Sequence, residues 1–151
     1  MKPEADFNPE ECRIVDGRQA ILGRLASDVA SSLLDGEKVV VVNAEDVVVS
    51  GERDDVIEKY RKKNELGSDQ GPYFPKRPDG IVKRTIRGMV PHKKRRGREA
   101  MSNLRVYIGT PAEYEDADIE KVDDADMHRL GKGGVVKLGE ISESIGANVT
   151  W

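Results

Sequence analysis

Four consecutive valines, Val39 to Val42, constrain the fold of this chain more than any other feature of its sequence. An unbroken run of β-branched residues is typical of a strand that is buried on both faces, and such strands occur mainly in parallel sheets. The run is far too short to cross a bilayer. The sequence therefore predicts a central strand of a parallel sheet.

The residues before the valines complete a strand–helix–strand unit. Residues 12–15 predict a short strand that ends at Asp16 and Gly17. The apolar residues that follow recur at the spacing of one helix face, and they are Leu22, Leu25, Ala26, Val29 and Leu33. Gly36 comes where a helix end favours a left-handed residue. Two parallel strands joined by a helix form a βαβ unit, which we expect to be right-handed.

Further strands and helices follow along the chain. Residues 47–49 extend the second strand past a bend or form a separate short strand, and residues 52–63 predict a helix. Alternating apolar residues at 104–108 predict a strand, the apolar residues at 135–138 suggest one more, and residues 139–145 predict a short last helix. A chain of 151 residues suits one domain, so we expect a single α/β domain over residues 1–151 with a small, mostly parallel sheet.

Charge is segregated along the chain, although the net charge is only −3. Residues 76–105, called the basic segment below, hold eleven Lys or Arg and two acids, which is a net charge of +9. Residues 1–75 and 106–151 each have a net charge of −6. A scattered excess of cations would suit a solvated face, but this segregation favours a polyanion as partner. We expect a nucleic-acid-binding excursion over about residues 67–103.

The basic segment also contains a predicted helix. Asp79 is placed to cap a helix that runs to about Met89 and ends before Pro91. The side predicted to lie on the core carries Val82, Ile86 and Met89, and the opposite side carries Lys83, Arg84 and Arg87. Such a helix can pack on a core while it presents cations outward.

The candidate RNA-binding residues are mainly the cations of this segment. They are Lys76, Arg77, Lys83, Arg84, Arg87, His92, Lys93, Lys94, Arg95, Arg96 and Arg98, with Arg24 as an outlying candidate at a predicted helix start. Lysine and arginine gain affinity by neutralising phosphates, and the arginine fork can also bind a phosphate bidentately or stack on a base. Gly88 and Gly97 lie among these cations, and we expect them to let the backbone approach the polyanion.

Residues 66–80 interrupt the pattern of helices and strands with three prolines and three glycines. Loops of this length are usually functional or disordered, and we expect residues 67–79 to be mobile in the isolated protein. Tyr73 and Phe74 within the loop could stack on unpaired bases. Packing beneath their own loop, or against a neighbouring protein, is at least as good an interpretation.

Other kinds of site lack the residues that they need. Residues 131–134 are rich in glycine but lack the spacing and the Ser or Thr of a P-loop, so a turn is the better interpretation. The acids at 123–126 match no calcium loop, and His92, His128 and Cys12 are too few and too far apart for a zinc site. We expect no cofactor, no metal, no small-molecule substrate and no enzyme activity.

The compartment follows from the cysteine and the N-terminal residues. Cys12 is the one cysteine, so it cannot form an internal disulfide, and the charges at the N-terminus are not followed by an apolar run. We expect a cytoplasmic protein without membrane contact.

Several motifs together resemble the universal large-subunit ribosomal protein thirteen family. Residues 86–91 read Ile-Arg-Gly-Met-Val-Pro, and Gly97-Arg98 and the strand at 104–109 follow at the family's spacing. Residues 21–27 and 41–44 resemble its N-terminal motifs, and residues 75–78 and 138–142 its archaeal branch. The resemblance covers nearly the whole chain. It implies a three-layer α/β/α fold with a four-stranded parallel sheet, no catalytic activity, and binding to large-subunit rRNA beside neighbouring ribosomal proteins, with residues 83–98 as rRNA contacts.

One feature departs from the resemblance, because ribosomal proteins of this kind are usually basic and this chain has a pI near 5.5. An acidic surface around a retained basic patch is similar to proteins of salt-loving archaea. At molar salt the Debye length is about 3 Å, so RNA binding would then depend on hydrogen-bond geometry and shape. A free-standing RNA-binding regulator is the alternative function, since it would share the patch.

Overall fold

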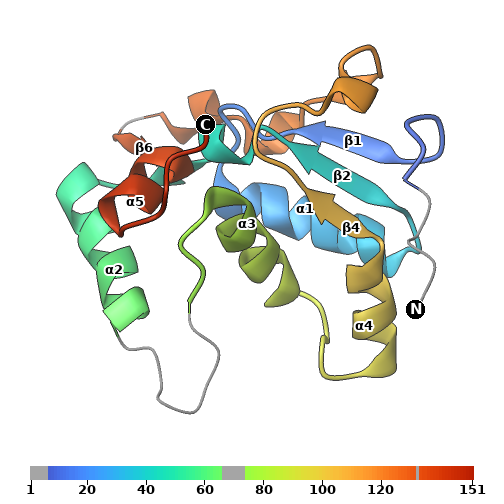
Figure 1. The fold of residues 1–151 in the computed structure, drawn as a ribbon, viewed down its shortest axis with the longest axis horizontal. Helices are drawn as coiled ribbons and strands as arrows, with labels where there is room; N and C mark the ends of the chain where they lie inside the picture. Colours follow the sequence, from blue (N-terminus) through green and yellow to red (C-terminus); the bar gives the residue numbers. More distant parts are fainter. Residues whose placement is uncertain (1–6, 66–73, 132) are drawn as a thin grey trace.

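The structure is a computed structural model that describes residues 7–65, 74–131 and 133–151 (Figure 1). The expectations for residues 67–73, including stacking by Tyr73, and for Lys132 in the glycine-rich turn lie outside the described residues.

The main sheet has four parallel strands in the order β4-β2-β1-β5. These strands are β1 Arg13–Asp16, β2 Val39–Val42, β4 Leu104–Val106 and β5 Ile119–Glu120. In β2, Val40 is paired with Ile14 on one side and with Arg105 on the other. All four valines of β2 are fully buried, so the predicted central parallel strand and the α/β class are confirmed.

A second sheet of two antiparallel strands stands apart from the first. It pairs β3 Val48–Ser50 with β6 Val135–Lys137. Residues 47–49 therefore belong to a separate strand, because Asn43 adopts a left-handed conformation and a 3-10 turn, η1 Ala44–Asp46, redirects the chain after β2. The strand predicted at 135–138 forms, but it joins this small sheet.

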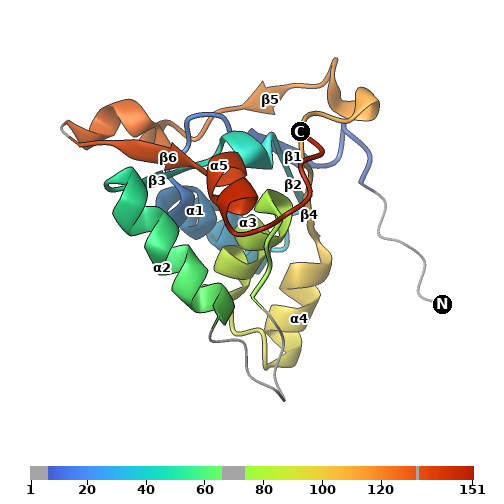
Figure 2. The same cartoon turned by 60° about the vertical axis from the view of Figure 1, so that its left-hand side comes forward.

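Five α-helices and three further 3-10 helices complete the described part of the chain. They are α1 Leu22–Leu34, α2 Arg53–Glu65, α3 Pro78–Arg87, α4 Arg95–Ser102 and α5 Leu138–Ser144, with η2 Ala112–Tyr114, η3 Asp123–Ala125 and η4 Met127–Leu130. Helices α2 and α5 pack together at the end of the molecule that carries the small sheet (Figure 2). None of these helices is long and apolar enough to span a membrane.

The prediction that Asp79 caps α3 is wrong. The helix starts at Pro78, whose fixed φ suits the first helical position, and Arg77 is the capping residue. The Asp79 carboxylate accepts a hydrogen bond from the Gly80 N–H (3.0 Å) and pairs with Arg77 (3.3 Å). The helix also ends at Arg87, two residues earlier than predicted.

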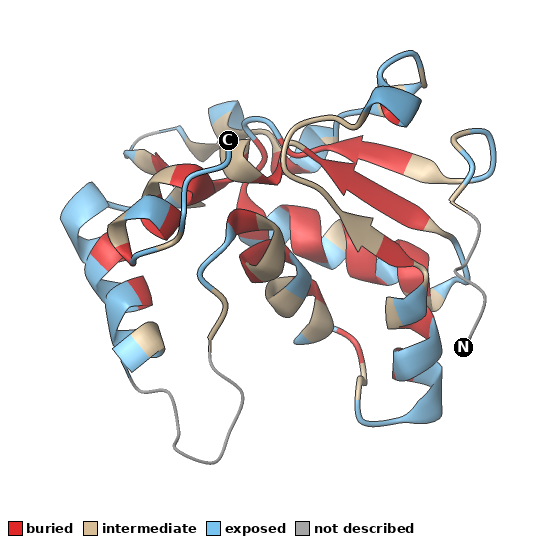
Figure 3. Ribbon diagram, in the orientation of Figure 1, coloured by how far each residue is buried: buried red, intermediate tan, exposed pale blue. Residues whose placement is uncertain are grey.

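The two faces of the main sheet are covered differently (Figure 3). The larger core lies between one face and helices α1, α3 and α4, and it continues to α2 and α5. On the other face, Ile14, Val40 and Val42 are covered by Tyr114 of η2, with Phe7 packed against them. In the described part of the chain, η2 and the segments around it form the layer on this face, which is thinner than the helical layer on the opposite face.

Candidate nucleic-acid interface

Helix α3 presents the first cluster of candidate cations because its opposite side is anchored in the core. Ile81, Val82 and Ile86 are fully buried and pack toward α1. Lys83 is exposed, and Arg84 and Arg87 are half-buried. The predicted division of α3 into a core side and a cationic side is therefore seen, with Ile81 added to the core. Met89 is wrongly assigned to the core, since it lies beyond the helix and is 43% exposed.

The loop between α3 and α4 is held by backbone contacts. The carbonyl of Arg87 accepts a hydrogen bond from the Val90 N–H (3.2 Å) and lies 3.2 Å from Nδ1 of His92. Val90 is buried, and the Lys94 N–H donates to the Pro91 carbonyl (2.9 Å). These hydrogen bonds fix the backbone of the loop, and with it the positions from which the loop side chains extend.

Helix α4 presents the second cluster. Its buried side consists of Gly97 and Ala100, packed toward α1, while the candidate cations of the loop end and the helix are all exposed (Figure 3). These exposed cations are Lys93, Lys94, Arg95, Arg96 and Arg98. A long cationic side chain on such a surface can reach a phosphate without opening the core.

Gly97 has a different role from the one that the sequence suggested. A Cβ at this position would lie 2.0 Å from the Pro91 carbonyl oxygen, so the glycine lets α4 pack against the protein's own loop. The expectation that Gly97 admits a polyanion is wrong for this reason. Gly88 is exposed, and an added Cβ would meet its nearest neighbouring atom at 3.5 Å.

Few of the candidate cations are neutralised within the described residues. Arg77 pairs with Asp79, and Arg95 pairs with Glu99 one helical turn away (3.0 Å), while the other candidates in the segment form no ion pair there. Arg98 donates from Nη1 to the Lys93 carbonyl (3.4 Å). Unpaired cations on an exposed face are available to phosphate groups.

Arg24 is an exposed residue in the first turn of α1. Its Nη1 donates to the carbonyl of Asp124 in η3 (3.4 Å). The structure thus joins Arg24 to an acidic turn.

An aromatic cluster that sequence reasoning missed joins the start of the basic segment to α2. The rings of Phe74 and Tyr60 lie 5.9 Å apart, and the ammonium of Lys63 lies over both, at 5.5 Å and 5.0 Å. Arg84 lies 5.9 Å above the Phe74 ring. Burial, with a smaller effect of Lys59, lowers the pKa of Lys63. Phe74 therefore packs within the protein, and the apolar spacing of Tyr60 in α2 was the available signal.

Lys76 lies beside another part of α2. It lines a pocket of about 390 Å³ together with Arg61, Asn64 and Glu65 of α2 and with residues 144–146 at the end of α5. Arg61 is thus a further cation beside the basic segment. Its position could not be read from the sequence, since α2 and Lys76 are separated by the loop.

The remaining sequence candidates are not assembled into another kind of site. No cluster of His, Cys, Asp or Glu suited to a metal ion occurs among the described residues. His128 is exposed and contacts Asp126, whose carboxylate lies 2.7 Å from Nδ1 and accepts the His128 N–H (2.8 Å). That carboxylate caps η4, so the acid belongs to a local turn.

Comparison with known proteins decides the family. The family model of ribosomal protein L13 matches residues 10–113, a stretch that includes every candidate cation. The chain belongs to the ribosomal protein L13 family. The large ribosomal subunit protein uL13 of Natronomonas pharaonis is 54% identical over 138 residues, which cover 91% of this chain and 93% of that relative.

Other members of the L13 family are similar over the same extent. The Haloarcula marismortui protein uL13 is 55% identical over 138 residues, again covering 91% and 93% of the two chains. The Methanosarcina barkeri protein is 51% identical over 136 residues, covering 89% of this chain and 97% of its own. The resemblance inferred from the motifs, including its archaeal and haloarchaeal character, is confirmed.

Proposed function

We propose that this chain is a non-enzymatic structural constituent of the large ribosomal subunit, in the cytoplasmic ribosome, and that it binds large-subunit rRNA. Membership of the L13 family carries the proposal, since the similar relatives are named as proteins of that subunit. A ribosomal-protein family supports a structural role over a catalytic one. Its partners would be the rRNA and the adjoining ribosomal proteins, and it would have no small-molecule substrate and no membrane contact.

The rRNA contacts are proposed to lie in one domain, on the excursion at 67–103. Its described part carries the exposed cations of the loop and α4 and the exposed or half-buried cations of α3, on a backbone that α1 and Gly97 hold in place. Arg24 is included as an outlying contact. Phosphate contacts from such cations provide affinity and fix orientation, and they carry no base specificity by themselves.

Sedimentation tests the ribosomal assignment. The full chain, expressed with a tag in an archaeal host, should co-sediment with large subunits through a high-salt cushion and be absent from the free-protein fraction. A chain that is washed off while other ribosomal proteins remain would be a free-standing RNA-binding protein.

A charge-removing variant tests the contact residues. Changing Lys93, Lys94, Arg95 and Arg96 together to Gln should leave the fold intact, because these side chains are exposed and the one ion pair among them, Arg95–Glu99, is on the surface. Affinity for rRNA should fall, and the salt slope should shrink by about 0.7–0.9 for each phosphate that is no longer neutralised.

The control compares double variants. Lys93→Gln with Lys94→Gln removes the same charge as Lys59→Gln with Lys62→Gln, whose side chains are exposed on α2. The first pair should weaken rRNA binding much more than the second at one fixed salt concentration. Equal losses from both pairs would mean that net charge, and not the basic segment, determines binding.

A further inference from the structure

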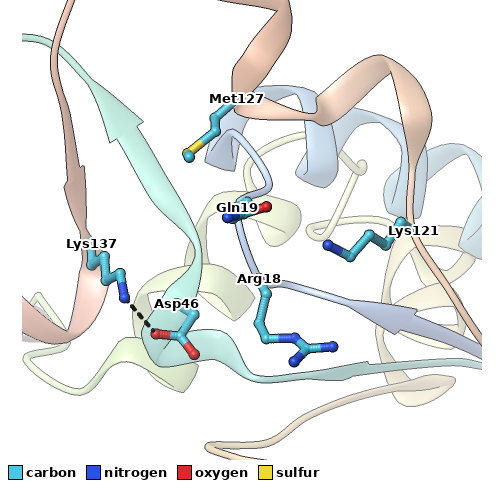
Figure 4. A pocket seen from close by; sticks show the side chains of 6 residues that line it. All are labelled: Arg18, Gln19, Asp46, Lys121, Met127 and Lys137. Atoms are coloured by element: carbon cyan, nitrogen blue, oxygen red, sulfur yellow. Dashed lines mark ion pairs between the residues drawn. The ribbon is translucent and has the colours of Figure 1, made fainter.

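A pocket of about 310 Å³ lies at the carboxyl ends of β1 and β5 (Figure 4). It is lined by Arg18, Gln19, Asp46, Lys121, Met127 and Lys137. The chain runs from β1 outward through β2 and β4 and then crosses back to place β5 on the other side of β1. In open parallel sheets, ligands bind where the strand order reverses in this way.

Three of the side chains that line the pocket are cations, and they come from three different segments. Arg18 follows β1, Lys121 follows β5, and Lys137 ends β6. Figure 4 shows the Lys121 side chain pointing from the chain after β5 toward Gln19 and Arg18. The one acid in the lining is Asp46, which lies 3.4 Å from the Lys137 ammonium. The lining therefore carries an excess of positive charge.

The Arg18 side chain is held in place by the buried carboxylate of Asp16. Asp16 is 3% exposed and accepts hydrogen bonds from the Arg18 N–H (2.9 Å) and from Nε (3.0 Å), with Nη2 at 2.9 Å. The side-chain amide of Asn43 donates to the same carboxylate (3.0 Å). The guanidinium is thereby oriented before any ligand arrives, although Asp16 offsets part of its charge.

Lys121 is the cation with the fewest partners in the pocket. It forms no hydrogen bond or ion pair with any residue in the described ranges. The Asp126 carboxylate is already engaged by the backbone N–H and the ring of His128, which lower its pKa, and the charge of Lys121 contributes less to that lowering. The Lys121 ammonium is consequently free to bind an added anion.

Gln19 contributes an unusual backbone to the same pocket. Its φ is 60°, a left-handed conformation that glycine adopts more easily, and it lies in a turn closed by the Ala20 N–H on the Gly17 carbonyl (3.1 Å). The N–H of Gln19 donates to the Asp46 carbonyl (3.1 Å), and its carbonyl accepts from the Met127 N–H (2.8 Å). A strained residue held on both sides often marks a ligand site.

We propose that this pocket binds a phosphate group through Arg18, Lys121 and Lys137, with the side-chain amide of Gln19 as a further donor. Asp16 engages Nε and Nη2 of Arg18, so the guanidinium can still donate to a phosphate from Nη1 and from the second hydrogen of Nη2. The flexible ammonium groups can bind the other phosphate oxygens. The phosphate belongs either to an RNA backbone or to a small phosphate compound. The assignment of the phosphate to RNA rests on the proposed function, whereas the assignment to a small phosphate compound does not.

Titration with inorganic pyrophosphate tests the chemistry of the site. In two-dimensional amide NMR of the full chain at fixed potassium chloride, we expect saturable shifts at residues 17–20, 121 and 137. Lys121→Gln with Lys137→Gln should weaken the affinity at least tenfold, and the charge-matched pair Lys59→Gln with Lys62→Gln should not. Saturation that is unchanged in the pocket variant, or shifts that arise only in the basic segment, would overturn the proposal.

Gln19→Gly separates a ligand-binding role from a structural one. Glycine relieves the left-handed strain, so the melting temperature should stay the same or rise, while removal of the amide should weaken pyrophosphate binding severalfold. A variant of equal stability with undiminished affinity would remove Gln19 from the site.

Lysine acetylation distinguishes the two sources of the phosphate. If RNA occupies the pocket, Lys121 and Lys137 should react more slowly in intact large subunits than after nuclease digestion. If pyrophosphate binds the free chain but RNA gives no protection, the RNA source is overturned and the small-phosphate site stands. A chain that never enters subunits contradicts the proposed function, and the pyrophosphate titration still decides the pocket.

Discussion

Gly97 lies against the backbone of Pro91, so that a Cβ at residue 97 would fall 2.0 Å from the Pro91 carbonyl oxygen and 2.7 Å from the His92 nitrogen. This contact locks the first turns of α4 to the loop that carries Lys93 and Lys94. The arrangement of the exposed cations thus depends on one missing methyl group.

Gly97→Ala should therefore destabilise the protein. The colliding atoms belong to the backbone and cannot move aside as a flexible side chain would, so we expect a loss of about 3 kcal/mol in the free energy of unfolding. Urea unfolding measures it. Gly88→Ala is the control, because its Cβ would meet ordinary contacts and its φ is −65°, and it should change stability little. Equal stability of the two variants would contradict the packing role of Gly97.

Asp16 should make the stability of the protein depend on acid pH. Burial alone would raise the pKa of Asp16, but hydrogen bonds from Arg18 and Asn43 hold it below its ordinary value. A carboxyl with a lowered pKa stabilises the fold above its unfolded pKa of about 3.9, and this contribution is lost as the pH falls through the folded pKa.

Asp16→Asn should remove that part of the pH dependence, and it should cost about 2 kcal/mol at pH 7 because charged hydrogen bonds are lost. The free energy of unfolding, measured by urea titration between pH 5 and pH 2, gives both quantities. Arg18→Gln should flatten the same slope, since it removes the principal partner. If neither variant alters the slope, Asp16 is not the group that titrates.

Stability should rise as potassium chloride is raised from dilute to molar concentrations. Twenty-eight acidic residues repel one another on a small surface, and salt screens that repulsion. Thermal melting followed by circular dichroism measures the effect. Asp116→Asn with Asp118→Asn, which neutralises two acids of the acidic C-terminal part, should raise the melting temperature at low salt and reduce its salt dependence. A flat or falling melting temperature in the unaltered chain would refute this prediction.

Phe74 should act in stability rather than in RNA stacking. Phe74→Leu keeps an apolar side chain and removes the ring beneath Lys63 and Arg84, and we expect a loss of about 1 kcal/mol with rRNA affinity unchanged. Phe74→Ala should cost about 2 kcal/mol because the half-buried side chain leaves a gap beside Tyr60. Urea unfolding and filter binding are the two measurements. A leucine variant that folds normally but binds rRNA weakly would restore the stacking interpretation.

The local parts of the fold could be predicted from the sequence because their signals are local. Val39–Val42 form a fully buried strand, and Leu25, Val29 and Leu33 share the buried side of α1, as their spacing indicates. Burial and periodicity both act within a few residues there, so the pattern alone identifies the element.

The parts that sequence reasoning missed depend on distant partners. Strand β5 has two residues and exists because Ile119 pairs with Ile14, which no pattern in the acidic segment reveals. Phe74 and Tyr60 pack together across a loop. The sequence does not indicate which backbone segment packs against a glycine such as Gly97. The candidate cations were readable as a charge pattern, and their contacts with rRNA stay a prediction.

Strand β5 lies late in the sequence, and this has a consequence during translation. Arg13 and Glu120 are 107 positions apart, yet they hydrogen-bond across the pair β1 and β5, and Arg13 also holds Asp28 of α1 at 2.6 Å. During translation, β1, α1 and β2 emerge long before β5, so the outer edge of β1 remains unpaired while the basic segment is made. An unpaired strand edge invites association with other chains. A nascent chain that stalls before Ile119 is therefore expected to be more prone to aggregate than the finished chain.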